Sequence, residues 1–255
     1  DRVFYTRENA RRLDDYRRRL DGLEPAIREL LLGPLLSQAS IRANTAGVFK
    51  GFYKDRSTGL GRFGGSGADA LSRITGTIEL EAPLQSGHEC EVAVFQEDAN
   101  ALAGRLPEID LAYIDPPYNQ HPYGSNYFML NLLVDYRPPE NTSSVSGIPT
   151  DWRRSDYNKR RKALTVIADV VHNTPAQFLL VSFNSEGFIG RETMVETLSR
   201  EGRVSVLETK YNTFRGSRNL RNRSPHVTEY LYLVARCPRR NRTTRFRRCA
   251  EDLRL

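Results

Sequence analysis

The run Asp110-Leu-Ala-Tyr-Ile-Asp-Pro-Pro-Tyr-Asn119 constrains the fold more than any other stretch of the sequence. Its apolar part, residues 111–114, predicts a buried strand, and Asp115 follows at the carboxyl end of that strand. The two prolines stop the strand, because each fixes φ and lacks a backbone N–H donor. Ligands of open α/β sheets bind at the carboxyl ends of strands. The sequence therefore predicts that Asp115 and Tyr118 are presented rigidly to a planar ligand with amino hydrogens. The alternative is a turn that merely ends a strand.

In residues 91–234, short apolar runs alternate with segments whose apolar residues have a helical period. Strands separated by helices of this length are typical of a largely parallel sheet that is covered on both faces. The sequence therefore predicts an α/β fold. The expected strands are 91–96, 111–114, 178–183, 204–209 and 229–234, and the expected helices are 97–102, 125–136, 156–172 and 191–201.

The N-terminal residues follow a helical pattern instead. Leu13, Tyr16, Leu20 and Leu23 recur at three- and four-residue steps, and Pro25 interrupts the pattern before it resumes. We expect a helical hairpin or a kinked helix over residues 8–36. We also expect two domains, 1–86 and 87–255.

Between residues 40 and 75, glycines, basic residues and aromatic rings are interleaved, which fits neither a regular helix nor a long strand. Glycine lets a backbone approach a ligand closely, and basic and aromatic side chains are typical contacts to phosphates and bases. An ordinary glycine-rich loop is the alternative. The candidates for phosphate contact are Lys50, Lys54, Arg56 and Arg62, and the candidates for stacking are Phe49, Phe52 and Tyr53.

The segment Phe63-Gly-Gly-Ser-Gly67 has the Phe-x-Gly-x-Gly form of a cofactor loop. Such a loop must follow a hydrophobic strand, and the preceding Thr58-Gly-Leu-Gly-Arg62 is not one. We therefore do not expect this segment to bind a cofactor.

The formal charge of +7 is concentrated near the C-terminus. Residues 215–255 hold twelve arginines and three acidic residues, a net +9, so the first 214 residues sum to −2. A basic tail beside a near-neutral body favours a polyanionic partner, with a solvated charged face as the alternative.

Several classes of protein are excluded by residue usage. Three widely spaced cysteines indicate neither a disulfide framework nor a zinc site, and the four histidines form no metal-ligand pattern. No apolar run approaches the roughly 18 to 20 residues that cross a bilayer, and the N-terminus lacks a signal-peptide pattern. The sequence predicts a soluble intracellular protein with no metal and no membrane partner.

Taken together, several segments resemble the adenine-specific DNA methyltransferases, and among them the Dam-like class of restriction-modification systems. The resemblance spans roughly residues 40–235. It implies a Rossmann-like methyltransferase sheet, mostly parallel with an antiparallel strand near the C-terminus, and a target-recognition region within residues 1–86. The segments that carry it are Asp115-Pro-Pro-Tyr-Asn119, His121-Pro-Tyr-Gly-Ser-Asn-Tyr127, residues 43–52 and 64–74, Ser182-Phe-Asn-Ser-Glu-Gly187 and Lys210-Tyr-Asn-Thr-Phe-Arg-Gly-Ser-Arg218.

The resemblance implies methylation of the exocyclic amino group (N6) of adenine in double-stranded DNA, with the base flipped out of the duplex. The amino nitrogen shares its lone pair with the ring, so acceptors must draw on its hydrogens before it attacks a methyl group. The Asp115 carboxylate and the Pro116 carbonyl suit that role, Pro117 stiffens the loop, and Tyr118 stacks on the base. Residues expected to line the pocket or support its loop are Asn119, Tyr123, Asn126 and Tyr127.

The same resemblance implies S-adenosylmethionine as the methyl donor, with Asp98 and Asp115 beside it. Asp98 is explained equally well as a helix N-cap. The glycine loop of a donor site is not recognisable in the sequence, so we expect a missing N-terminal segment or a second polypeptide to supply it. Basic residues expected in a loop beside the flipped base, where they suit phosphate contacts, are Lys210, Arg215, Arg218, Arg221 and Arg223.

Two other hypotheses stay open. The first is a catalytically inactive DNA-binding module, which would bind DNA in a salt-sensitive manner and would not bind the donor. The second is a methyltransferase that acts on RNA or on a protein amide, since Pro-Pro-Tyr motifs also serve those substrates.

Overall fold

The computed structural model describes residues 3–45, 47–49, 51–55, 57–64, 70–143, 148–151, 154–212 and 226–236. Their contacts divide them into two compact units. Unit 1 takes the described residues of Asp1–Ala93 and His121–Arg154, and unit 2 takes those of Val94–Gln120, Ser155–Thr213 and Arg223–Leu255. The expected domain boundary at residue 86 stays a prediction.

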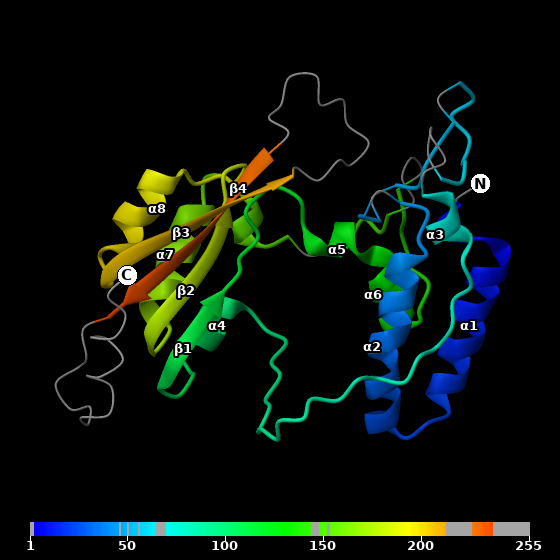
Figure 1. Ribbon diagram of the computed structural model, residues 1–255, viewed down its shortest axis with the longest axis horizontal. Coiled ribbons are helices and arrows are strands. Elements are labelled where there is room, and N and C mark those ends of the chain that lie inside the picture. Colours follow the sequence, from blue (N-terminus) through cyan, green and yellow to red (C-terminus); the bar gives the residue numbers. More distant parts are fainter. Residues whose placement is uncertain are drawn as a thin grey trace. The chain divides into compact units, whose positions relative to one another are not determined.

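Two helices that lie side by side frame unit 1 (Figure 1). Helix α1 (Arg7–Asp21) begins where the side chain of Thr6 accepts a hydrogen bond from Asn9 N at 3.1 Å. Helix α2 (Pro25–Ile41) begins with proline, whose missing N–H costs nothing at that position. Pro25 thus separates two helices, and the expected hairpin is confirmed. The other helices of unit 1 are α3 (Leu71–Thr75), α5 (Tyr123–Asn126) and α6 (Phe128–Asp135).

The apolar stripes of α1 and α2 meet in a core that also receives α6. Leu13, Leu20, Leu35 and Leu133 are all buried in it. Arg17 is buried beside them, and its guanidinium donates to Leu133 O at 2.6 Å and to Val134 O at 3.1 Å. A cation in this position satisfies carbonyls at the C-terminus of α6. Residues 125–136 form two helices, α5 and α6, rather than the single helix expected.

Unit 2 is built on a four-stranded mixed sheet of order β1-β2-β4-β3 (Figure 1). The α/β class is confirmed. A mostly parallel sheet is wrong for the described strands, because β4 lies between β2 and β3 and runs antiparallel to both, and only β1 and β2 pair in parallel. The expected antiparallel strand near the C-terminus is therefore present. The strands are β1 (Ile109–Ile114), β2 (Ala176–Asn184), β3 (Arg203–Asn212) and β4 (His226–Ala235).

Helices cover one face of this sheet. Leu179, Val181 and Phe183 of β2 point to that face and pack with side chains from three helices. On the opposite face, Leu111 and Tyr113 of β1 are 52% and 61% exposed, so the expectation of a buried strand here is wrong within unit 2. The helical elements of unit 2 are α4 (Ala99–Ala103), the 3₁₀ turn η1 (Asp156–Asn158), α7 (Ala163–Asn173) and α8 (Arg191–Leu198); the single helix expected over 156–172 is thus η1 followed by α7.

Residues 91–96 do not form the expected strand. They are irregular, and Val92 and Val94 are 76% and 89% exposed. An extended segment becomes a strand only when its backbone pairs with a neighbour, and no described strand pairs with this one. Among the described residues, no helix combines the length and apolarity needed to cross a membrane.

Candidate functional site

The predicted acidic motif lies where β1 ends beside β2. Ile114, the last residue of β1, is opposite Val181, so Asp115 leaves the sheet shortly before β2 itself ends. The Asp115 side chain is exposed, whereas Pro116 is buried. The buried Pro116 thus anchors the loop in unit 2. The Asp115 carboxylate is accessible to solvent, as the sequence predicted.

The turn that follows β2 holds Tyr118. The Tyr118 carbonyl accepts a hydrogen bond from Phe188 N at 2.9 Å. Its ring lies edge-on to the Phe183 ring, with centroids 6.3 Å apart and an angle of 78° between the planes. The position of Gly187 has no room for a side chain, because a Cβ there would lie 2.3 Å from the Phe183 ring. These contacts were not predicted, although the segment Ser182–Gly187 was part of the resemblance.

Asn158 fixes the backbone of Asn119, the residue that follows Tyr118 in the motif. Its side-chain Nδ2 donates to Asn119 O at 2.8 Å, and Asn158 is itself buried in η1. Asn119 therefore lies in the same unit as Asp115 with its backbone fixed. Nothing in the sequence pointed to Asn158, because the two residues are 39 positions apart.

A second carboxylate lies at the same edge of the sheet. Glu229, in β4, is paired in register with Asn184 of β2, whose Nδ2 donates to Glu229 Oε1 at 3.5 Å. Burial raises the pKa of Glu229, the hydrogen bond from Asn184 lowers it, and the nearby charge of Asp115 raises it further. An acid at the head of the apolar run Glu229-Tyr-Leu-Tyr-Leu-Val234 was the signal that could have identified it.

The aromatic residues predicted to line the pocket come together in unit 1. The rings of Tyr123 and Tyr127 stack with centroids 5.7 Å apart and 29° between their planes. The carbonyl of Asn126, between them, accepts a hydrogen bond from Phe49 N at 2.7 Å. The structure therefore groups these three residues with each other and with the glycine-rich segment that follows α2.

Part of the glycine-rich segment forms a short hairpin. Lys54 and Gly61 form an antiparallel bridge, and Arg62 N donates to Tyr53 O at 2.8 Å. Asp55 closes the turn, where the side-chain hydrogen bond from Ser57 is the largest of the effects that lower the Asp55 pKa to about 2. The described residues of the two arms are therefore paired by backbone hydrogen bonds.

Two predicted basic residues lie on opposite arms of this hairpin. Lys54 Nζ lies 5.3 Å from the centroid of the Phe52 ring, and Arg62 Nη1 lies 3.4 Å from Asp55 Oδ2. The stacking role suggested for Phe49 is wrong, because Phe49 is only 1% exposed and packs in the core with Phe4.

Several predicted basic residues lie outside the described residues: Lys50, Arg56, Arg215, Arg218, Arg221 and Arg223. Lys210 is described and exposed, but it lies within β3 rather than in a loop. The strand is longer than expected because β4 pairs with it as far as Asn212.

The described residues do not fit a complete site for a nucleoside cofactor. Asp98 is the N-cap of α4, and its Oδ1 accepts hydrogen bonds from Asn100 N at 3.0 Å and Ala101 N at 3.1 Å. The segment before it, 91–96, is not a strand. A dinucleotide-like loop needs a strand that leads into a glycine turn and a helix, and the described part of the chain contains no such turn beside β1.

Unit 1 also contains a cavity of about 810 Å³. Its walls include Phe4, Phe128, Met129, Asp135 and Arg137. None of the side chains predicted for the site lines this cavity, so we assign it no role.

Comparison with known proteins identifies the class of enzyme to which this arrangement belongs. The model of the D12 class N6 adenine-specific DNA methyltransferase family matches residues 2–184. The chain therefore belongs to that family, whose members use S-adenosylmethionine. The predicted resemblance is confirmed at this level.

Curated relatives are type II modification enzymes. The chain is 28% identical over 239 residues to the type II methyltransferase M.CviAII of Paramecium bursaria Chlorella virus 1, and that match covers 92% of this chain and 66% of the relative. It is 26% identical over 245 residues to M.NlaIII of Neisseria lactamica, covering 92% of this chain and 67% of the relative. With the modification methylase StsI of Streptococcus sanguinis it shares 27% identity over 215 residues, covering 82% of this chain and 30% of the relative. The chain thus spans about two thirds of the first two relatives. No solved structure matches it.

Proposed function

We propose that this chain carries the methyl-acceptor side of an enzyme that methylates N6 of adenine in double-stranded DNA, within a restriction-modification system. The observation that carries the proposal is the anchored loop Asp115–Tyr118, in which an exposed acid and a held aromatic ring follow a sheet strand. Family membership and the type II relatives support the choice of substrate. The Rossmann-like arrangement of the sheet is implied by the family alone.

The acceptor chemistry follows from the residues of this loop. The Asp115 carboxylate and the Pro116 carbonyl accept the two amino hydrogens, so the nitrogen lone pair is directed away from the adenine ring. Tyr118 stacks on the base, and Pro117 limits the freedom of the loop. Adenine reaches this geometry only when it leaves the duplex, so the enzyme flips its target base.

Contacts to the DNA come from unit 1 and from the arginine-rich segment. In this proposal Lys54 and Arg62 of the hairpin bind phosphates, and Tyr123, Asn126 and Tyr127 contact the DNA from unit 1. Asn119 supports the acceptor loop within unit 2. Lys50 belongs to the same set by sequence. The C-terminal set comprises Lys210, Arg215 and Arg218.

For the donor, we propose S-adenosylmethionine, which supplies the methyl group when it is bound. Of the chain's own residues, Asp98 and Asp115 face it in this proposal. Since the described residues do not fit a complete donor site, its glycine loop comes from a further N-terminal segment or from a second polypeptide. The proposal therefore treats activity as a property of the assembled enzyme.

The decisive experiment is methyl transfer with isotopically labelled donor. The full-length protein, given duplex DNA, should place label on N6 of adenine, and Asp115→Ala should remove that activity while DNA affinity changes little. Absence of label in adenine under all conditions contradicts the function. Activity of Asp115→Ala within tenfold of the wild type contradicts the role of Asp115.

A DNA-binding module without catalysis is the second candidate, favoured by the irregular, exposed segment 91–96. It predicts salt-sensitive DNA binding with no heat of donor binding in titration calorimetry. Duplex RNA and a protein extract, offered in the labelling assay beside DNA, test the alternative substrates.

A further inference from the structure

Asn184 is fixed so that its amide hydrogens face Glu229. The Asn184 Oδ1 atom accepts a hydrogen bond from Glu186 N at 3.1 Å, which orients the amide group. Its Nδ2 is then directed across the strand pair, 3.5 Å from Glu229 Oε1. The two residues are direct partners in the antiparallel register of β2 and β4. Glu229 is therefore held at the edge of the sheet where β2 ends.

Asp115 follows β1 at the end of the sheet where Glu229 lies. Ile114, Val181 and Tyr232 are opposite one another along the register and belong to the core on the helix-covered face. Side chains alternate between faces along a strand, so Glu229, three positions before Tyr232, belongs to the other face. The charge of Asp115 is near enough to raise the pKa of Glu229. A second carboxylate, that of Glu229 in β4, thus lies at the end of the sheet from which the loop of Asp115 leaves.

Among the described residues, the two direct strand partners of Glu229 are uncharged. On β2 it faces the uncharged Asn184, and on β3 it is opposite the uncharged Thr209. The charged groups on neighbouring positions are Glu208, whose carboxylate pairs with Arg191 at 2.6 Å, Lys210, which is opposite Thr228, and Asp115 at the end of β1.

An ionised Glu229 does not stabilise the folded protein, so stability is no reason for a glutamate at this position. Its pKa is raised in the folded protein, mainly by burial, so the folded state binds the proton more tightly than the unfolded state does. The free energy of unfolding therefore falls as the pH rises from the unfolded pKa near 4.5 through the raised value. A glutamine at this position, which keeps an acceptor for Asn184, would avoid that loss.

We propose that Glu229, oriented by Asn184, is a second carboxylate of the acceptor site, which stabilises the positive charge on the adenine amino nitrogen as that nitrogen gains a methyl group. This inference rests on the proposed function. The bond from N6 to the methyl carbon would form as the bond from that carbon to the donor's sulfonium sulfur breaks. The amino nitrogen would then be cationic until it releases a proton to solvent, and a fixed anion nearby lowers the energy of that state. In this proposal Asp115 contacts the amino group directly. Glu229 does not contact it and stabilises the positive charge of the nitrogen through the electrostatic field of its carboxylate.

The first test measures the pair without using activity. Side-chain carboxyl signals of ¹³C-labelled glutamate are titrated by NMR in the wild type, in Asp115→Asn and in Asn184→Ala. We expect the pKa of Glu229 to fall in Asp115→Asn, because a like charge is removed, and to rise in Asn184→Ala, because a hydrogen bond to the ionised form is lost. An unchanged Glu229 pKa in Asp115→Asn overturns the pairing.

The second test measures the single-turnover rate of methylation against pH in the full-length enzyme. Glu229→Gln should lower the rate constant at pH 8 about tenfold with little change in KM for DNA, and the acid limb of the profile should move to lower pH. Thermal unfolding at pH 8 should show Glu229→Gln at least as stable as the wild type. The control is Glu208→Gln, an exposed acid of the neighbouring strand, whose rate and profile should match the wild type.

The outcomes separate this inference from the proposed function. If the wild type methylates adenine and Glu229→Gln has the same rate and profile, the function stands and the role of Glu229 is overturned. If the wild type does not methylate adenine, the proposed function fails, and the role of Glu229 fails with it even where NMR shows the coupling. A loss of activity that follows a loss of stability, with an unchanged pH profile, also overturns the role.

Discussion

At the scale of single residues, the candidate site depends on contacts that hold Tyr118 and Asn119 from behind. Phe188 N and the Phe183 ring hold Tyr118, and Asn158 holds the carbonyl of Asn119. Geometry within a site must be kept to fractions of an ångström for positioning to aid a reaction. In the proposed function, the residues that hold Tyr118 and Asn119 therefore affect the reaction without contacting the base.

Gly187 tests this dependence. In Gly187→Ala the new methyl group meets the Phe183 ring, which must shift and disturb Tyr118. We expect a loss of about 1–3 kcal/mol in the free energy of unfolding and weaker stacking on the flipped base. Stacking is measured from the fluorescence of 2-aminopurine at the target position of the methylated sequence.

The matched control is Gly190→Ala, a few residues along the same turn. A Cβ at Gly190 has only the Glu192 carboxylate near it, at 4.0 Å. This variant should show the fluorescence and stability of the wild type. Equal effects of the two substitutions would refute the role given to Phe183.

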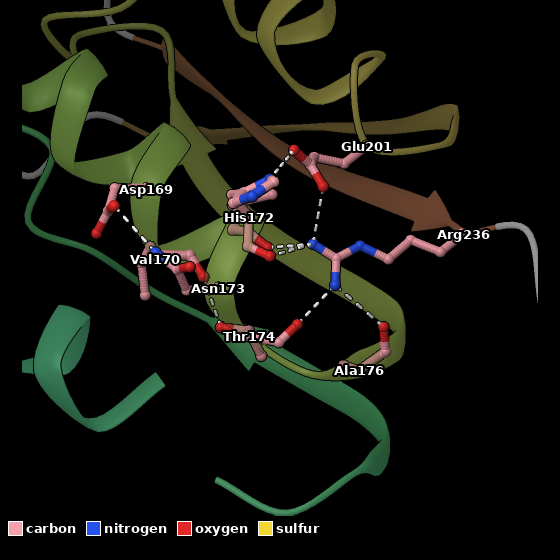
Figure 2. Close-up of polar contacts among 9 residues, drawn as sticks. Asp169, Val170, His172, Asn173, Thr174, Ala176, Glu201 and Arg236 are labelled. Carbon is pink, nitrogen blue, oxygen red and sulfur yellow. Dashed lines mark hydrogen bonds and ion pairs between the residues drawn. The ribbon is translucent and has the colours of Figure 1, made fainter. Parts of the chain in front are cut away.

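At the scale of elements, Arg236 contacts the C-terminus of α7, the residues that lead into β2 and Glu201. These contacts lie at the end of the sheet remote from Asp115. Figure 2 shows the Arg236 guanidinium beside carbonyls of the last turn of α7 and of the residues that lead into β2. It donates to Thr174 O at 2.6 Å and His172 O at 3.2 Å, and it pairs with Glu201 at 3.1 Å. A cation here stabilises the C-terminus of α7 and its turn into β2.

Arg236→Met should therefore reduce stability and leave the chemistry unaffected. The Arg236 and Glu201 side chains are 17% and 21% exposed, so the pair is largely desolvated. We expect the free energy of unfolding to fall by about 2–4 kcal/mol in urea denaturation. Arg200→Met is the control, because the Arg200–Glu196 pair is 71% and 74% exposed and should contribute less than about 0.5 kcal/mol. Similar losses in both variants would contradict this assignment.

At the scale of the whole molecule, the proposed binding of DNA depends both on net charge and on where the fold places basic side chains. The sequence carries +7 overall, with the excess near the C-terminus, and the hairpin of unit 1 adds Lys54 and Arg62. Release of counterions from phosphates drives such binding and makes it depend on salt. Both regions should therefore contribute to the salt dependence of DNA affinity.

The double variant Lys54→Gln, Arg62→Gln tests the hairpin. If each residue neutralises one phosphate, the slope of log affinity against log salt should become shallower by about 2. Fluorescence anisotropy with labelled duplex DNA over a range of salt measures the slope. The control is Lys159→Gln, Lys162→Gln, since both lysines pair with Asp156 and lie in unit 2. An unchanged slope in the hairpin variant would remove the hairpin from the interface.

The arginine-rich segment is tested in the same way. Replacing Arg215, Arg218, Arg221 and Arg223 with glutamine should make the slope shallower by about 3 to 4 and weaken binding to all sequences alike. An unchanged slope would assign this segment to an ordinary solvated surface.

What the sequence determined by itself is the local chemistry. The apolar run followed by Asp115 and two prolines was enough to predict the end of β1 and an anchored loop, because proline geometry acts within a few residues. Periodicity predicted α1, α8 and all four described strands to within three residues of their bounds, whereas α2 continues five residues past the expected end at residue 36. The motifs identified the family. Only the tertiary structure decided which distant residues support the loop, since Asn158 reaches it by a hydrogen bond to Asn119 and Phe183 by its ring contact with Tyr118. The failure at 91–96 has the same cause: a strand exists only when another strand pairs with it.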